Sequence, residues 1–163
     1  MLKKFIILLQ QSLIVVFTEI ETIPIIITFG IETSLDDILQ VYLQSKYQII
    51  RIQQDISLKY IRMYENVMLL IINSDNPYVR NSNLAKKIHQ ENLFQNVPII
   101  GLCLKKYFKN MENSERYLYD DILLLPCNNE DILTRIEVWT NTAEFLMNYE
   151  EESKTFSIDK LEI

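Results

Sequence analysis

The stretch Asn66-Val-Met-Leu-Leu-Ile-Ile-Asn-Ser74 decides the fold. It is a short apolar run bounded by polar turn residues, which is typical of a β-strand that is buried on both faces. Pro24 to Phe29 and Val97 to Leu102 are similar runs before and after it. The spacers between the three runs are long enough for one crossover helix each. We therefore expect an α/β chain with this strand at the centre of a parallel sheet.

The rest of the chain alternates in the same way. Residues 47–53 and 121–125 read as two more strands. Ser34 is the expected N-cap of the clearest amphipathic helix, in which Asp37 completes an acidic capping box. Further helices are expected over residues 55–65, around Leu84 to Ile88, loosely over 105–117, and from Asn128 or Asn129 to about Tyr149. Residues 75–82 are expected to form a loop, and residues 150–154 a break before a strand-like tail over 155–163.

The composition is that of an acidic globular protein. The 163 residues carry a net charge of −6, and 48% of them are hydrophobic. Lysine and arginine are scattered, so we expect no direct binding of nucleic acid. Cys103 and Cys127 are too few for a disulfide framework and favour a reducing compartment. We therefore expect a cytoplasmic protein. The abundance of Ile, Asn and Lys is typical of an A+T-rich genome, such as that of a plastid or a reduced bacterium, and a plastid-encoded chain would be stromal.

The N-terminal segment precedes the first expected strand and has an ambiguous pattern. Lys3 and Lys4 come before two apolar runs, as in a signal peptide, but Gln10 and its neighbours interrupt them and no small-residue cleavage site follows. An extra element packed on the domain is the favoured interpretation. A membrane-surface helix and a targeting peptide stay open. We therefore divide the chain into an extension (1–21), one domain (22–149) and a tail (150–163).

Five strands alternating with helices predict a flavodoxin-like, doubly wound parallel sheet with strand order 2-1-3-4-5. Two segments make the resemblance more specific. They are Asn96-Val-Pro-Ile-Ile-Gly-Leu-Cys103 and Asp120-Asp-Ile-Leu-Leu-Leu-Pro-Cys-Asn-Asn-Glu-Asp-Ile-Leu-Thr-Arg-Ile136. Through them, residues 24–141 resemble the CheY-like receiver domain of two-component response regulators. The second segment is similar to the fifth strand, proline-containing loop and last helix of that family.

The resemblance implies a phosphorylation site that this chain has lost. Receivers phosphorylate an aspartate at the end of the third strand, next to an acidic pair that holds a divalent cation. A hydroxyl after the fourth strand and a lysine after the fifth bind the phosphoryl group. Carried over, the acceptor falls on Ile71, and the other positions fall on Gly30, Ile31, Cys103 and Leu125. Glu32 alone is a poor magnesium site. We therefore predict a pseudo-receiver without aspartyl phosphorylation, metal or cofactor.

The other polar candidates have plain structural interpretations. Asp75 is expected to form a turn, and His89 to point outward from its helix without metal partners. Asp120 and Asp121 precede the fifth strand and are expected to be surface turn residues. Cys103 and Cys127 could form a redox pair, although two ordinary small apolar residues are the favoured interpretation. The absence of a glycine-rich loop argues against a nucleotide or flavin site.

We expect a non-enzymatic regulatory module that acts through protein contacts. The contact face would include Ile122, at the position of the family's switch aromatic, with Arg135 and Trp139. Trp139 also fits the buried stripe of the last helix. A histidine kinase, another response regulator or RNA polymerase are the expected partners, a homodimer is possible, and no membrane partner is expected.

Two other functions stay open. Phe156-Ser-Ile-Asp-Lys-Leu-Glu-Ile163 vaguely resembles the start of the winged-helix domain that follows some receivers, so the chain could be the remnant of a DNA-binding response regulator. A small flavodoxin-like enzyme would need polar groups at the carboxyl edge of the sheet.

Overall fold

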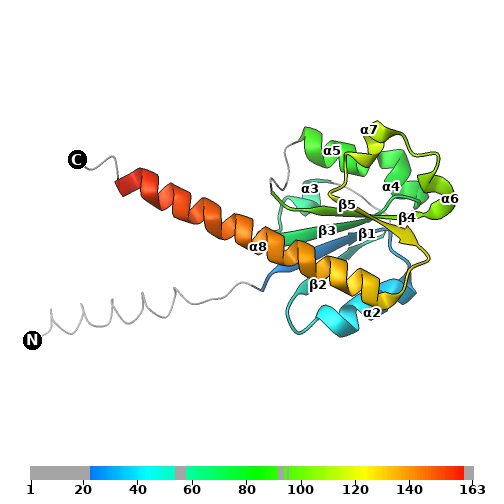
Figure 1. Cartoon of the computed structure of the whole chain (residues 1–163), viewed down its shortest axis with the longest axis horizontal. Coiled ribbons are helices and arrows are strands. Elements are labelled where there is room, and N and C mark those ends of the chain that lie inside the picture. The colour runs from blue at the N-terminus through cyan, green and yellow to red at the C-terminus, as the bar shows by residue number, and fades with distance from the viewer. Residues whose placement is uncertain (1–22, 54–57, 92–93, 95, 160–163) are drawn as a thin grey trace, which may run out of the picture.

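A computed structural model describes residues 23–53, 58–91, 94 and 96–159 of the chain (Figure 1). Its five strands form one parallel sheet in the order β2-β1-β3-β4-β5. This order and the flavodoxin-like architecture are those predicted from the sequence. The strands are β1 (Ile25–Phe29), β2 (Gln48–Ile52), β3 (Val67–Asn73), β4 (Ile99–Leu104) and β5 (Asp121–Leu125).

The central strand β3 is buried on both faces, as the apolar run indicates. Val67, Leu70 and Ile72 belong to one core cluster, and Leu69 and Ile71 belong to the other. Successive side chains of a strand point to opposite faces of the sheet. An uninterrupted apolar run therefore supplies both cores at once.

Helices cover both faces of the sheet in three layers (Figure 1). On one face, α2 (Thr33–Leu43) and α8 (Asn129–Asp159) contribute Leu39, Ile132 and Ile136 to the core. The helices of the other face contribute Ile61, Val79 and Ile88, among others. These are α3 (Leu58–Ile61), α4 (Pro77–Ser82) and α5 (Leu84–Gln90), while the short α6 (Lys105–Phe108) and α7 (Asn113–Arg116) follow β4.

Several predicted helix boundaries were wrong. Ser34 is not an N-cap, because α2 begins at Thr33 with Glu32 as its N-cap, and no side chain caps it. The expected loop over 75–82 contains α4, since Asn76 accepts hydrogen bonds from the amides of Tyr78 and Val79. Asn and Pro mark a helix start here as well as a loop. The segment 105–117 contains two single-turn helices, and the described part of the segment 55–65 contains only α3.

The last helix, α8, is longer than predicted. The Asn128 side chain accepts a hydrogen bond from the Asp131 amide at 2.7 Å, which confirms the expected cap. The expected break over 150–154 and the strand-like tail are wrong as far as Asp159, because α8 continues to that residue. Leu146, in the second half of α8, is 39% exposed. Figure 1 shows that the end of α8 runs past the sheet.

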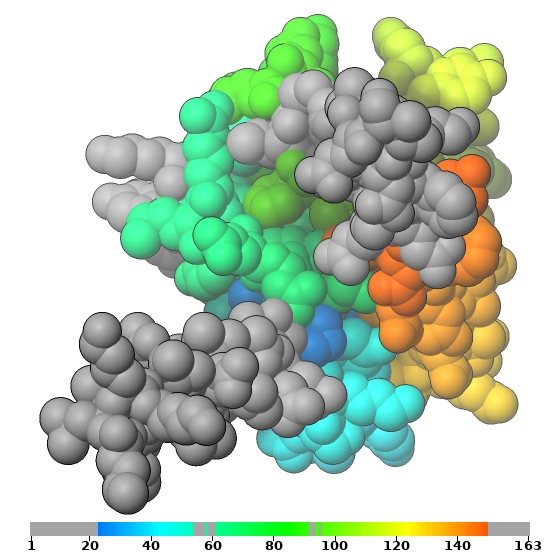
Figure 2. All heavy atoms as spheres, turned by 90° about the vertical axis from the view of Figure 1, so that its left-hand side faces the viewer, coloured from blue at the N-terminus to red at the C-terminus, as the bar shows by residue number. Residues whose placement is uncertain are grey.

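The start of β1 lies beside α8 at the edge from which that helix leaves the domain. Pro24 lines one cavity together with Glu144, Met147 and Asn148 of α8. Figure 2 shows the same neighbourhood, with the first described residues next to the helix. The predictions for residues 1–21 lie outside the described residues. Within the part of the chain that the structure describes, no helix is long and apolar enough to span a membrane.

Candidate functional site

The carboxyl ends of the strands meet at one edge of the sheet, where ligands bind in folds of this type. Gly30 follows β1, Asn73 ends β3, Leu104 ends β4 and Leu125 ends β5. Leu104 and Leu125 are direct partners across the sheet, and Asn73 is the partner of Leu102. We call these strand ends and the residues that follow them the carboxyl edge.

Gly30 has a structural reason to be glycine. Its φ of +64° is unfavourable for residues with a Cβ, and a Cβ there would lie 2.7 Å from Cγ of Asn76. Its carbonyl accepts hydrogen bonds from the side-chain amides of Asn73 at 3.0 Å and Asn76 at 3.1 Å. Ile31, the next residue, is 2% exposed. The resemblance to receivers implies an acidic pair after β1. Two side-chain amides and an apolar side chain occupy this place instead.

Ile71 does not lie at the carboxyl edge. It pairs with Thr28 and Ile100 inside the sheet, and its buried side chain belongs to the core cluster beneath α2 and α8. The last residue of β3 is Asn73, two positions further on. The placement of Ile71 at the strand end thus needs correction, because the apolar run alone does not show where pairing with the neighbouring strands stops.

Asp75 is the anion of the carboxyl edge. One carboxylate oxygen accepts a hydrogen bond from the Leu104 amide. The other lies 3.5 Å from the Arg80 guanidinium and 3.9 Å from the Cys103 sulfur, which donates to it. The Asp75 side chain is only 10% exposed. Asp75 therefore joins the segment after β3 to the end of β4, a larger role than the turn predicted for it.

The two cysteines at this edge are free thiols. Cys103 is buried and Cys127 is half-buried. Burial raises the pKa of both thiols, and the neighbouring carboxylates of Asp75 and Asp131 raise it further. Since the thiolate is the reactive form, both side chains are poor nucleophiles near neutral pH. This agrees with the favoured structural interpretation.

Next to Asp75, the surface carries cations and an aromatic ring. Arg80 lies 5.0 Å and Lys106 4.7 Å from the centre of the Tyr107 ring. A cavity of about 300 Å³ opens between α4, α5 and α7, and Ser74, Arg80 and Tyr119 are among the residues that line it. The Ser74 hydroxyl donates to the Leu102 carbonyl at 3.0 Å, so it is already bonded.

A buried charge that the sequence analysis missed lies beside β1. Asp36, in the first turn of α2, is 1% exposed. It forms an ion pair with Arg51 at 3.3 Å, and it accepts hydrogen bonds from the Thr28 hydroxyl and the Gln53 amide. Burial raises the pKa of Asp36, while Arg51 and Thr28 act against that shift. The available signal was a charged residue beside Leu35 and Leu39 on the inward stripe of an amphipathic helix.

The opposite, amino edge of the sheet holds Asp120 and Asp121, and neither is a simple surface turn residue. Asp120 accepts a hydrogen bond from the Ile99 amide at 2.7 Å. Asp121 accepts from Arg135 at 2.8 Å and from the Trp139 indole at 3.2 Å, which fixes β5 to α8. Ile122 is half-buried, and Trp139 packs partly against the core beneath α8.

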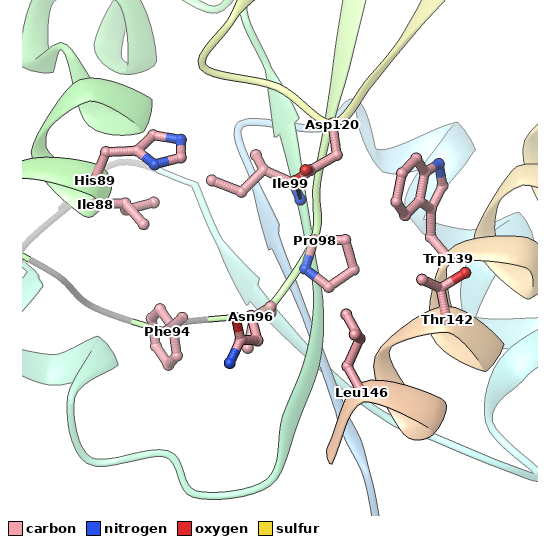
Figure 3. A pocket seen from close by; sticks show the side chains of 11 residues that line it. Ile88, His89, Phe94, Asn96, Pro98, Ile99, Asp120, Trp139, Thr142 and Leu146 are labelled. Carbon is pink, nitrogen blue, oxygen red and sulfur yellow. Dashed lines mark hydrogen bonds between the residues drawn. The ribbon is translucent and has the colours of Figure 1, made fainter. Parts of the chain in front are cut away.

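A cavity of about 320 Å³ also lies at the amino edge (Figure 3). His89, Phe94 and Pro98 form one part of its wall, and Trp139 and Leu146 of α8 form the opposite part. A ring nitrogen of His89 lies 3.0 Å from the Leu118 carbonyl, which gives the imidazole a hydrogen-bond partner within the domain. Among the described residues, no three His, Cys, Asp or Glu side chains gather as a metal site would require.

Comparison with known proteins identifies the fold. No family model and no curated protein sequence matches the chain. Solved structures do match. An adenylate cyclase chain from Rhodopirellula baltica superimposes with a TM-score of 0.66 at 16% identity, over 82% of this chain and 98% of that one.

Two further matches carry receiver domains in their names. The signal receiver domain of a LuxO repressor protein from Vibrio parahaemolyticus gives a TM-score of 0.65 at 16% identity, over 79% of this chain and 98% of that one. A receiver-modulated diguanylate cyclase from Pelobacter carbinolicus gives 0.58 at 23% identity, over 78% and 99%. At these identities the likeness shows the fold. The chain therefore has the CheY-like fold of the receiver domains of response regulators.

Proposed function

We propose that this chain is a receiver-like regulatory module that acts through protein contacts and accepts no phosphoryl group. The carboxyl edge supports this proposal. Gly30 and Ile31 stand where receivers carry the acidic pair, and Leu125 stands where they carry a lysine. These three positions supply neither the acidic pair that holds magnesium nor the lysine that binds the phosphoryl group in receivers.

We assign the position of the aspartate that receivers phosphorylate to Asn73, and no longer to Ile71. Asn73 is the last residue of β3, and its side-chain amide lies 3.0 Å from the Gly30 carbonyl. An amide cannot form the acyl phosphate that an aspartate forms. The substitution of Asn for Asp removes the reactive group and keeps a polar side chain at the edge.

Asp75 supplies a permanent anion at this edge. Its carboxylate binds the Leu104 amide and the Cys103 thiol, at the end of β4. The resemblance to receivers places the phosphoryl-binding hydroxyl at Cys103. The proposed module therefore holds the segment after β3 against β4 without a kinase, and its state does not depend on phosphorylation.

Phosphorylation can be tested directly with acetyl phosphate and Mg²⁺, read out by intact mass, with an ordinary receiver domain as the positive control. We expect no phosphoryl adduct on the unmodified chain or on the Ile71→Asp variant. Asn73→Asp should also stay unmodified, because no acidic pair is present to hold magnesium. A stoichiometric adduct on the unmodified chain would refute the proposal.

The face formed by β5 and α8 is the proposed contact surface. Arg135 is 54% exposed although it is paired with Asp121, and Val138 next to it is 53% exposed. We expect affinity capture from the native extract to recover a histidine kinase, a response regulator or RNA polymerase. The Arg135→Glu/Val138→Glu variant should lose this partner.

The matched control for that capture is Met63→Glu, since Met63 is 76% exposed and follows α3, which packs on the face of the sheet opposite to α8. Recovery of the same partner with all three proteins would place the contact on another surface. Recovery of no signalling protein at all would argue against a protein-binding module.

A further inference from the structure

We propose that the cavity between α4, α5 and α7 binds a small organic carboxylate with an apolar body. The carboxylate contacts Arg80 and Lys86 at the rim of the cavity, and the apolar body lies on its buried floor. These three helices lie on the side of the sheet opposite to α8 (Figure 1). The proposal goes beyond the regulatory function and does not depend on it.

The floor of the cavity is apolar. Val79 of α4 and Leu84 and Ala85 of α5 line it, and each of them is at most 4% exposed. The volume is about 300 Å³. A water molecule takes up about 30 Å³ in the liquid, so the cavity has room for roughly ten non-hydrogen atoms. The ligand that fits is therefore a small molecule with an apolar part.

The rim of the cavity carries more positive than negative charge. Arg80 is 51% exposed, and its ion pair with Asp75 spans 3.5 Å. Lys86 is exposed and forms no ion pair with the residues that the structure describes. Glu115, also exposed, is the acidic residue of the lining. Two cations against one carboxylate favour an anionic ligand.

The charge around the cavity is opposite to that of the whole chain. The chain has a net charge of −6, but residues 76–111 contain six lysine and arginine residues and one acidic residue, Glu91. Glu91 is itself paired with Arg62. A guanidinium binds a carboxylate well through parallel hydrogen bonds. A carboxylate carries a single charge, so Glu115 repels it less than a phosphate group with nearly two charges.

Tyr119 adds a hydrogen-bond donor to the lining of the cavity. Its ring lies over β4, since a Cβ on Gly101 would be 2.9 Å from Cδ1 of the ring. Burial raises the pKa of the Tyr119 hydroxyl and Glu115 raises it further, so this group keeps its proton. The hydroxyl forms no hydrogen bond with the described part of the chain. It is therefore available to donate to a bound ligand.

Nuclear magnetic resonance titration of the full ¹⁵N-labelled chain with phenylacetate, benzoate and hexanoate tests the proposal. We expect saturable shifts of the amide signals of residues 79–86 and 114–119, with dissociation constants on the order of 1 mM for ligands of this size. Phenylacetamide has the same shape without the charge and should bind about fivefold more weakly. The absence of saturable shifts with all three carboxylates would overturn the proposal. Equal shifts with inorganic phosphate would also overturn it, because the apolar floor would then have no role.

Lys86 and Lys87 provide a matched pair of variants. Both are exposed neighbours on α5, and of the two only Lys86 lines the cavity. Lys86→Gln should raise the dissociation constant of phenylacetate about threefold, and Lys87→Gln should leave it unchanged. Glu115→Gln removes the like charge and should lower the dissociation constant about threefold. Equal effects of the two lysine variants would assign the attraction to the general charge of the surface and overturn the site.

Ala85→Leu tests the floor of the cavity. The larger side chain fills the space of the apolar body, so the saturable shifts should disappear while the amide signals of β3 stay in place. Unchanged binding would place the ligand elsewhere and overturn the proposal. If this variant failed to fold, the lysine pair would still decide, because both of those side chains are exposed. None of these outcomes alters the phosphorylation and capture experiments, so the two proposals can fail separately.

Discussion

Single carboxylates hold the carboxyl edge of this domain together, and Asp75 is the most important of them. Its two oxygens bind the Leu104 amide, the Cys103 thiol and the Arg80 guanidinium, while its side chain is 10% exposed. In Asp75→Asn, the amide NH₂ would face one of these donors and leave it without an acceptor. We expect the free energy of unfolding, from urea denaturation, to fall by about 1–3 kcal/mol.

The matched control for Asp75 is Asp37→Asn. The Asp37 side chain is 65% exposed, and its ion pair with Arg51 spans 3.6 Å. An exposed pair of this kind contributes about 0–1 kcal/mol. If both variants lost the same small amount of stability, Asp75 would not hold β3 and β4 together.

The buried carboxyl group of Asp36 makes the stability of the domain depend on pH, and the direction of its pKa shift fixes the sign of that dependence. Burial raises its pKa above 3.8, while Arg51, Thr28 and Gln53 act against the shift and Asp37 adds to it. A carboxyl group with a raised pKa binds its proton more tightly in the folded state than in the unfolded state. Its stabilising contribution is present at pH values below 3.8 and is lost as the pH rises through the folded pKa.

The comparison with Asp36→Asn isolates this contribution. The free energy of unfolding of the unmodified chain, minus that of Asp36→Asn, should decrease between pH 3.5 and neutral pH, as a series of urea titrations would show. A difference that grows with pH would mean that the ion pair with Arg51 outweighs the cost of burying the carboxylate.

At the scale of elements, the sequence predicted what depends on local pattern. β5 was predicted residue for residue, and β3 to within one residue at each end, because turn residues bound short apolar runs. α4 was missed because Asn76 and Pro77 occur in loops as well as at helix starts. The tail was misassigned because residues 150–154 are polar throughout. A helix that projects from the domain has no core to face, so its sequence lacks the apolar stripe by which a helix is predicted.

The candidate site was predictable only in part, because local sequence patterns do not show tertiary contacts. The apolar and amide character of the carboxyl edge follows from the residues themselves. The place of Asn73 at the end of β3 depends on where its pairing with β1 and β4 stops, which is a tertiary property. The bonds of Asp75 and Asp36 likewise join residues far apart in the sequence, so no local pattern reveals them.

The joint between α4 and α5 provides a test of element geometry. Asn83 ends α4 with a φ of 51°, in the left-handed region, and α5 begins at the next residue. A β-branched residue is unfavourable there, so Asn83→Val should lower the free energy of unfolding by about 1–2 kcal/mol. Asn83→Gly should change it by less than about 0.5 kcal/mol, since glycine adopts this conformation readily. Equal losses would show that the Asn83 side chain, and not its backbone, stabilises the joint.

At the scale of the whole molecule, the domain uses the two edges of its sheet differently. The carboxyl edge is closed by the bonds of Asn73, Asn76 and Asp75, which leave these polar groups occupied. At the amino edge, a cavity lies beside α8, the helix projects, and the N-terminal segment joins β1. This difference between the two edges supports the contacts along α8 that we propose.

This division predicts which parts of the chain the domain needs in order to fold. Every buried residue of the described structure lies between Ile25 and Ala143, so a chain of residues 22–149 should fold with the same β-sheet content by circular dichroism. Ending the chain at Arg135 would remove Ile136, Thr140 and Ala143 and expose the part of the sheet that this stretch of α8 covers. We expect that shorter chain to lose more than about 5 kcal/mol, the lower end of typical domain stability, and to remain unfolded. If residues 22–149 also failed to fold, the projecting half of α8 or the N-terminal segment would be part of the core, and the domain would extend beyond the sheet and its covering helices.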